Sequence, residues 1–238
     1  LQQTNLKRML AYSSIAHTGY LLLGVLVAGK TDQGYGPVFL YLASYTVMNL
    51  GAFGLVSLLA QRADAGTNLH GLAGLSRKNP WLAFSMSVFL LSMAGIPPTA
   101  GFAAKYLMLS QAVQAGEIPL TVIAVLCSAI SVYYYLRVLV YMSMREPSAA
   151  GAYQGGRSIA AYVTVAMMVA LTLQLGLQPD RWMAIAKRAV PTSSASAELA
   201  LIDSLLVVAR AEALKLEVTS GPVDVGELVT SVVATGRM

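Results

Sequence analysis

Four stretches of about twenty residues contain no Asp, Glu, Lys or Arg, and they constrain the fold of this chain more than any other feature. They are Met9–Ala28, Val38–Ala60, Ile118–Leu136 and Ser158–Pro179. A helix of about 20 apolar residues crosses the ~30 Å hydrocarbon core of a bilayer. Lipid admits only helices or closed barrels, and these stretches lack the alternation of barrel strands. The sequence therefore predicts transmembrane helices.

Composition agrees with a membrane environment. Hydrophobic residues make up 56% of the chain and charged residues 11%, whereas soluble domains have about 25% charged residues. The single cysteine, Cys127, excludes a disulfide and a cysteine metal site, and we expect it to be a packing residue. No phosphate-binding loop, metal-ligand cluster or nucleophile motif is visible. We therefore expect no cofactor in this chain.

A fifth apolar segment, Trp81–Gly116, is 36 residues long and has Pro97 and Pro98 near its middle. Two prolines cannot both keep a helical hydrogen-bond ladder, because each lacks an N–H and crowds the preceding turn. We expect a helix up to Ala94, a tight break and a new helix from about Thr99. With helices expected at 10–28, 37–61, 119–144 and 158–177, the chain is predicted to be an all-α, polytopic bundle of about six hydrophobic helices.

The charge balance changes near Pro191. Residues 1–191 carry 13 Lys and Arg against 5 Asp and Glu, whereas residues 192–238 carry 3 against 6. Apolar residues recur at helical spacing between 199 and 216 with charges on the other faces, which is typical of a soluble amphipathic helix. We therefore predict a membrane domain over 1–190 and a short, charged, soluble tail over 191–238.

Lys105 is the only charged residue in the segment Trp81–Gly116. An ionisable group at membrane depth is energetically expensive and by default marks a functional pathway. Burial disfavours the charged form of an amine, so a lysine in such a place suits reversible proton transfer. The alternative is a packing lysine whose amine reaches the membrane interface.

Four further polar residues are weaker candidates. Lys7 and Arg137 flank apolar spans, where interfacial anchoring is the simpler interpretation. His17 is surrounded by Ser, Thr and Tyr hydroxyls, so it is either a proton-transfer residue or a buried histidine with satisfied hydrogen bonds. Asn49 lies in the charge-free second helix, where a hydrogen bond between helices is its simplest role.

Four blocks of sequence, in order, resemble the family of subunit N of NADH-quinone oxidoreductase, the antiporter-like membrane subunits of respiratory complex I. The blocks are Gln3–Tyr20, Tyr45–Phe53, Leu91–Tyr106 and Tyr133–Val138, and the resemblance extends over residues 1–190. It implies the second of two inverted repeats of an antiporter-like fold plus the last helix. In that match Lys7 and Lys105 fall on intramembrane lysines of the family.

The resemblance implies a function in proton translocation coupled to electron transfer from NADH to quinone. Lys7, Lys105 and His17 would transfer protons in a multi-pass protein of the bacterial inner membrane. Its partners would be the bilayer and other membrane subunits, which would bind quinone and NADH, and it would bind no nucleic acid. The first repeat is missing, so we expect this piece alone to be inactive. The alternatives are a subunit of a multisubunit cation/proton antiporter and a membrane-tethered signalling fusion.

The tail resembles a different family. Residues 198–230 are similar to the second dimerisation helix of a sensor histidine kinase and the entry to its ATP-binding domain. The phospho-accepting histidine helix and the nucleotide-binding boxes are absent from the sequence, so this resemblance implies no kinase activity.

Overall fold

The computed structural model describes residues 3–59, 68–146, 159–189 and Asp203. The described residues up to 189 belong to one compact unit, Leu1–Val190. Its elements are α1 (Leu6–Ala28), α2 (Gly36–Leu59), η2 (Leu69–Leu72), α3 (Leu75–Lys78), α4 (Pro80–Ala94), α5 (Ala100–Gln114), α6 (Ile118–Met144), α7 (Ile159–Leu177) and α8 (Pro179–Ala189). The helix predicted between 199 and 216 lies outside the described residues.

The prediction of six hydrophobic helices is confirmed by α1, α2, α4, α5, α6 and α7. In the part of the chain that is described, α1, α2, α6 and α7 are each long and apolar enough to cross a membrane. Short elements that were not predicted are η2 and α3, before α4, and α8, which follows α7 directly. The side chains of Met183 and Lys187 on α8 pack against Gly36 at the start of α2.

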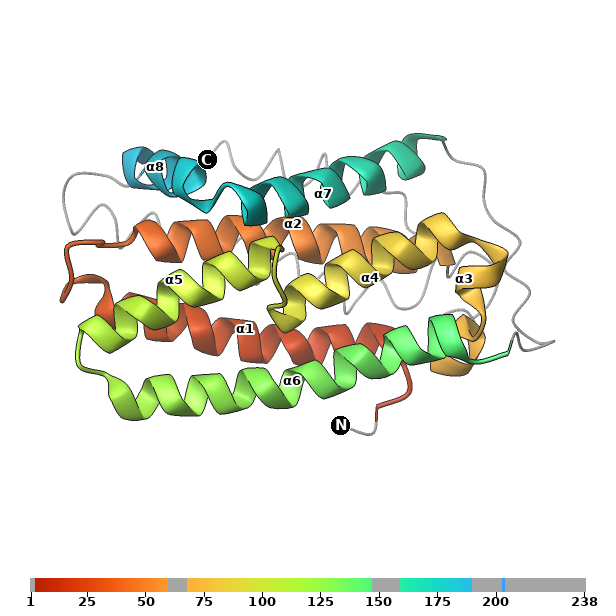
Figure 1. The fold of residues 1–238 in the computed structure, drawn as a ribbon, viewed down its shortest axis with the longest axis horizontal. Coiled ribbons are helices and arrows are strands. Elements are labelled where there is room, and N and C mark those ends of the chain that lie inside the picture. Colours follow the sequence, from red (N-terminus) through yellow and green to blue (C-terminus); the bar gives the residue numbers. More distant parts are fainter. Residues whose placement is uncertain (1–2, 60–67, 147–158, 190–202, 204–238) are drawn as a thin grey trace. The chain divides into compact units, whose positions relative to one another are not determined.

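The helices make five passages through the bundle, because α4 and α5 together make only one. Each has 15 residues, or roughly 22 Å of helix, and Figure 1 shows them end to end and running in the same direction. At one end of the bundle Asn79, before α4, donates to the Tyr162 hydroxyl at 3.3 Å. At the other end Gln111, near the end of α5, donates to Thr31 at 2.7 Å. Because the number of passages is odd, the start of α1 and the end of α7 lie at opposite ends of the bundle. Six passages would have placed them at the same end.

The centre of the bundle is α2, which packs against α1, α4, α5, α7 and α8. A core cluster joins Leu40 of α2 to Ala100, Leu175 and Ala186 of α5, α7 and α8. Small residues let α2 come close to its neighbours, since a Cβ on Gly51 would collide with the ring of Phe89 on α4. Close approach at small residues is the usual way in which helices associate in lipid, where no hydrophobic force drives them together.

The break between α4 and α5 occupies 95–99. Gly95 ends α4 with φ 85°, a left-handed conformation that glycine adopts without strain. The N–H of Gly95 and that of Ile96 both return to the carbonyl of Leu91, at 3.0 Å each. On the far side of the break, the Gly101 N–H donates to the Ser92 hydroxyl at 3.0 Å. The sequence prediction of a helix to Ala94 and a new helix near Thr99 is confirmed.

The first half of α6 touches the bundle along a narrow strip, with Thr121 buried and Ser128 half-buried. Cys127 lies beside this strip and is exposed. The expectation that Cys127 is a packing residue was therefore wrong. Thr121 and Ser128 are seven residues apart and so share the buried face of α6, whereas Cys127 lies outside that face.

Gly176 of α7 lies directly against the break, since a Cβ there would collide with the backbone of Pro98 and Thr99. We predict that Gly176→Ala destabilises the bundle by about 1–3 kcal/mol, as overpacking of a tight contact usually does. The measurement is thermal unfolding of the full-length subunit in detergent. Gly54→Ala is the matched control, because Gly54 is also helical and nothing lies within 4 Å of an added Cβ. Equal unfolding temperatures for the two variants would contradict the close contact.

With five passages, the basic residues that flank the helices can be assigned to the two ends of the bundle. Among the described residues, Lys7, Arg8, Arg77, Lys78 and Arg145 lie at one end of the bundle, whereas the described connections at the other end contain one basic residue, Lys30. Three further basic residues belong to α8, which follows the last passage and packs against the start of α2 at that other end. We name the end with the five basic residues the basic end. Cytoplasmic loops carry an excess of Lys and Arg. Because the described connections and flanks before α8 have this excess at the basic end, we expect the basic end to face the cytoplasm.

The orientation can be tested by labelling single cysteines from outside the cell in a Cys127→Ser background. Glu146→Cys lies at the basic end and Gln114→Cys at the opposite end, and both positions are exposed. We predict that a membrane-impermeant maleimide added to spheroplasts labels Gln114→Cys and leaves Glu146→Cys unlabelled until the membrane is opened. Labelling in the reverse pattern would invert the assignment.

Candidate functional site

Lys105 lies in the middle of the bundle, one and a half turns into α5, and only 5% of its side chain is exposed. Its amine donates to the carbonyls of Met93 at 2.9 Å and Ala94 at 3.3 Å. A third bond, of 3.1 Å, joins it to the hydroxyl of Ser128 on α6. An ammonium has three N–H donors, so these three acceptors satisfy it fully.

The proline break creates this site. Where α4 stops, its last carbonyls have no partner within the helix and carry the negative end of the helix dipole. Lys105 reaches back across the break to two of them. The amine also lies 5.1 Å from the ring centroid of Tyr20 on α1, within the range of a cation–π contact. No described carboxylate pairs with Lys105, so dipoles and a ring surround the amine.

His17, about 2% exposed on α1, lies at the centre of a second group of buried polar side chains. Its Nδ1 is 2.8 Å from the Tyr41 hydroxyl on α2, and its Nε2 is 3.4 Å from the Tyr135 hydroxyl on α6. Tyr135 also bonds to the Ser13 hydroxyl. The ring of Tyr45 lies 4.8 Å from the imidazole, centroid to centroid. We name Ser13, His17, Tyr41, Tyr45 and Tyr135 the histidine cluster.

Tyr20 stands between Lys105 and the histidine cluster. Its ring centroid is 6.1 Å from that of His17 and 6.2 Å from that of Tyr41. Its hydroxyl donates to the carbonyl of Ala124 on α6 at 3.2 Å. His17 and Lys105 are close enough to interact electrostatically. The structure therefore brings together two of the three residues predicted to transfer protons.

The third residue, Lys7, lies apart from them. It is half-buried in the first turn of α1, ten residues before His17, which corresponds to roughly 15 Å along the helix. Asn49 is buried in α2. Arg137 lies near the end of α6 with its guanidinium 5.9 Å from the Tyr141 ring. The roles expected for Asn49 and Arg137 stay predictions.

Sequence reasoning missed Ser128, Tyr41 and Tyr135 as partners of the lysine and the histidine. A signal existed in α2, where Tyr41 and Tyr45 are four residues apart and thus share one face of a charge-free helix. Tyr135 was visible only as one of three consecutive tyrosines, of which Tyr133 is 60% exposed. The sequence did not identify Ser128 as a partner of Lys105, because the contact joins residues 23 positions apart on two different helices, α5 and α6. No group of three or more His, Cys, Asp and Glu that could hold a metal occurs in the described part of the chain.

Comparisons with known proteins agree with this geometry. Residues 1–131 match the family model described as NADH:quinone oxidoreductase/Mrp antiporter, TM. NADH-quinone oxidoreductase subunit N of Trichlorobacter lovleyi is 53% identical over 142 residues, which are 60% of this chain and 29% of that protein. The subunit N of Methylovorus glucosotrophus is 42% identical over 193 residues, which are 81% of this chain and 39% of that protein.

Solved structures give the same result. A structure of respiratory complex I from Thermus thermophilus with bound aureothin matches with a TM-score of 0.65 at 37% identity. The match covers 77% of this chain and 40% of that one. A structure of the Mrp complex from Dietzia sp. DQ12-45-1b matches with a TM-score of 0.68 at 21% identity, over 78% of this chain and 42% of that one. The second match shows a shared fold.

The chain spans 29% of the length of the first of these curated relatives and 39% of the second. The family model nevertheless covers more than half of the chain, and its matched region contains Lys105, His17 and the proline break. The buried lysine at a broken helix, the all-helical membrane bundle and these matches agree. This chain belongs to the NADH:quinone oxidoreductase/Mrp antiporter transmembrane family.

Proposed function

We propose that this chain is the proton-conducting part of a membrane subunit of proton-translocating NADH:quinone oxidoreductase. The observation that carries the proposal is the Lys105 amine, buried at the broken helix and hydrogen-bonded to two carbonyls and one hydroxyl. Lys105, His17 and Lys7 are the proposed proton-transfer residues. The chain is a multi-pass protein of the bacterial inner membrane.

Of the three acceptors around Lys105, only Ser128 can exchange a proton. Backbone carbonyls have none to give, whereas a hydroxyl can either accept or donate. When the ammonium releases its proton, the amine keeps two N–H donors for Met93 and Ala94, and its new lone pair can accept from Ser128. The local hydrogen bonds are therefore conserved in both charge states. This lowers the reorganisation needed for reversible transfer.

The histidine cluster supplies a second stretch of a proton path. Tyr135 and Tyr41 contact different nitrogens of the His17 ring. A neutral imidazole accepts at one nitrogen and donates from the other, so it can take a proton on one side and release one on the other. The ring of Tyr20 separates this stretch from Lys105. A complete path therefore requires a water molecule or a side-chain rotation at Tyr20.

The whole reaction requires more than this chain. Other membrane subunits are the proposed partners, and they would bind quinone and NADH, while this chain itself would hold no cofactor. Conduction by its lysines would be driven by redox energy that arrives from those partners. Because the chain spans a minor part of its relatives' length, activity tests belong in the full-length subunit within its complex.

The second candidate is a subunit of a multisubunit cation/proton antiporter, since the Mrp complex has the same fold at 21% identity. Identities of 42% and 53% to subunit N proteins favour the oxidoreductase. Co-purification separates the two candidates, because the oxidoreductase subunit is expected in a complex that oxidises NADH. Recovery with an antiporter complex that lacks this activity would favour the alternative.

We predict that Lys105→Ala strongly lowers proton pumping by the assembled complex in reconstituted vesicles. The reason is that the variant removes the amine that is hydrogen-bonded at the break, and with it the group proposed to carry the proton. Ser128→Ala keeps the lysine and should lower pumping as well, because it removes the exchangeable hydroxyl. The measurement is the initial rate of vesicle acidification at a matched rate of NADH oxidation.

Lys30→Gln is the control for the loss of a lysine. Lys30 forms an exposed ion pair with Glu117 at 2.6 Å, and such pairs contribute about 0–1 kcal/mol. Normal pumping is expected in this variant. If Lys105→Ala assembles normally and pumps as well as Lys30→Gln, then Lys105 is a packing residue.

Tyr135→Phe tests the histidine cluster. It preserves the volume of a fully buried side chain and removes the hydroxyl between Ser13 and His17. We predict a fall in pumping of at least about tenfold, because positioned proton-transfer groups typically contribute more than that. Tyr133→Phe on the same helix is the matched control, since Tyr133 is 60% exposed. Equal pumping by the two variants would remove Tyr135 from the path.

A further inference from the structure

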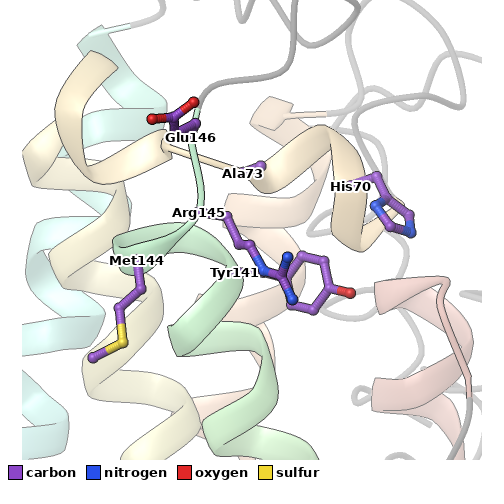
Figure 2. Close-up of a pocket in the computed structure, with 6 residues that line it drawn as sticks. All are labelled: His70, Ala73, Tyr141, Met144, Arg145 and Glu146. Atoms are coloured by element: carbon purple, nitrogen blue, oxygen red, sulfur yellow. The ribbon is translucent and has the colours of Figure 1, made fainter.

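A pocket at the basic end of the bundle lies outside the proposed proton path. It forms where the end of α6 packs against the turn before α3, with the Gly74 N–H donating to the Tyr141 carbonyl at 3.4 Å. Its volume is about 470 Å³, and it is lined by His70, Ala73, Tyr141, Met144, Arg145 and Glu146 (Figure 2).

Positive and donor groups surround one ring in this pocket. The guanidinium of Arg145 lies 5.2 Å from the ring centroid of Tyr141, and that of Arg137 lies 5.9 Å from it. The His70 ring meets Tyr141 edge-on at 5.5 Å. Glu146 is the one carboxylate of the lining, and in Figure 2 it points away from the paired side chains of Tyr141 and Arg145. Arg145 forms no ion pair with any described carboxylate.

An apolar stripe runs along α6 from this pocket toward the middle of the membrane. Met144, Val140, Leu136 and Tyr133 are all exposed, and Met144 is 76% exposed. Their spacings of four, four and three residues place them on one face of the helix. From Met144 to Tyr133 the stripe is roughly 16 Å long, which matches one leaflet, about half of a ~30 Å hydrocarbon core.

We propose that the pocket binds the phosphate headgroup of an anionic phospholipid, with one acyl chain lying along the stripe. Arginine is suited to phosphate because its planar fork donates two parallel hydrogen bonds. The His70 ring can supply another donor. A free phosphate ion would use the same donors, but it would leave the stripe unused. The basic end is also the end expected to face the cytoplasm, where anionic lipids attract basic residues beside membrane helices.

The test uses the full-length subunit in its complex, purified in mild detergent from membranes that contain phosphatidylglycerol and phosphatidylethanolamine. Lipid retained on the complex is measured by mass spectrometry. We expect Arg145→Gln to lower retained phosphatidylglycerol at least about tenfold, as loss of a charge-assisted hydrogen bond predicts. Arg188→Gln, an exposed arginine on α8, is the matched control and should retain the lipid. Glu146→Gln should retain at least as much, because it removes a nearby negative charge.

Two further measurements identify the occupant. Val140→Asn leaves the headgroup site intact and places an amide on the stripe, so it should lower lipid retention if the acyl chain lies there. Millimolar inorganic phosphate should not displace the lipid. Equal retention by Arg145→Gln and Arg188→Gln would overturn the proposal. Displacement of the lipid by phosphate would overturn the proposal, because the occupant would then be a free anion. It would also be overturned if the Arg145→Gln complex kept its lipid and lost a neighbouring subunit, because the occupant would then be a protein.

Discussion

The hydrogen bonds between the Lys105 amine and the last carbonyls of α4 are the interaction on which the structure of the bundle centre depends. A helix that stops inside a membrane leaves carbonyls without partners, and each unsatisfied backbone group in lipid costs several kcal/mol. Here the carbonyls of Leu91 and Ser92 are satisfied by the turn itself, whereas those of Met93 and Ala94 accept from Lys105. The break and the lysine therefore stabilise each other. An uninterrupted helix would offer no carbonyls to the amine, and a break without the amine would leave two carbonyls unsatisfied.

This mutual dependence explains why the surrounding contacts are so close. Gly101 approaches the backbone of Ser92 so closely that a Cβ would collide with its carbonyl, and Gly176 approaches Pro98 and Thr99 in the same way. Side chains at these two positions would force α5 and α7 away from the break and lengthen the bonds of Lys105. Neither glycine bonds to Lys105, but the close contacts at both glycines fix the positions of the helices that hold the lysine and its acceptors. A site whose chemistry depends on bonds of 2.9 to 3.3 Å needs such rigid support.

Much of this arrangement could be predicted from the sequence, for identifiable reasons. Charge-free stretches of membrane-spanning length predicted the helices, and two adjacent prolines predicted the break within a residue of its observed position. Lys105 was selected because it is alone in an apolar segment. The expectation that the six helices make six separate passages was wrong, because helix length alone does not show whether two short helices turn back or continue. The partners of Lys105 and His17 on other helices also escaped prediction, since they come from residues distant in sequence, as Ser128 and Tyr135 do.

The direction of α5 after the break decides how the two ends of the bundle differ. If α5 turned back at the prolines, Arg145 and Lys30 would lie at the same end. Because α5 continues in the direction of α4, Arg145 instead lies at the end that holds Arg77 and Lys78, opposite Lys30. The break therefore does more than hold an amine. The broken helix holds a buried amine and still crosses the bundle only once. The ends of the other helices therefore lie on the same sides as they would with an unbroken helix. Lys105 consequently lies between two chemically different ends, the basic end and the end that carries the exposed Lys30–Glu117 pair.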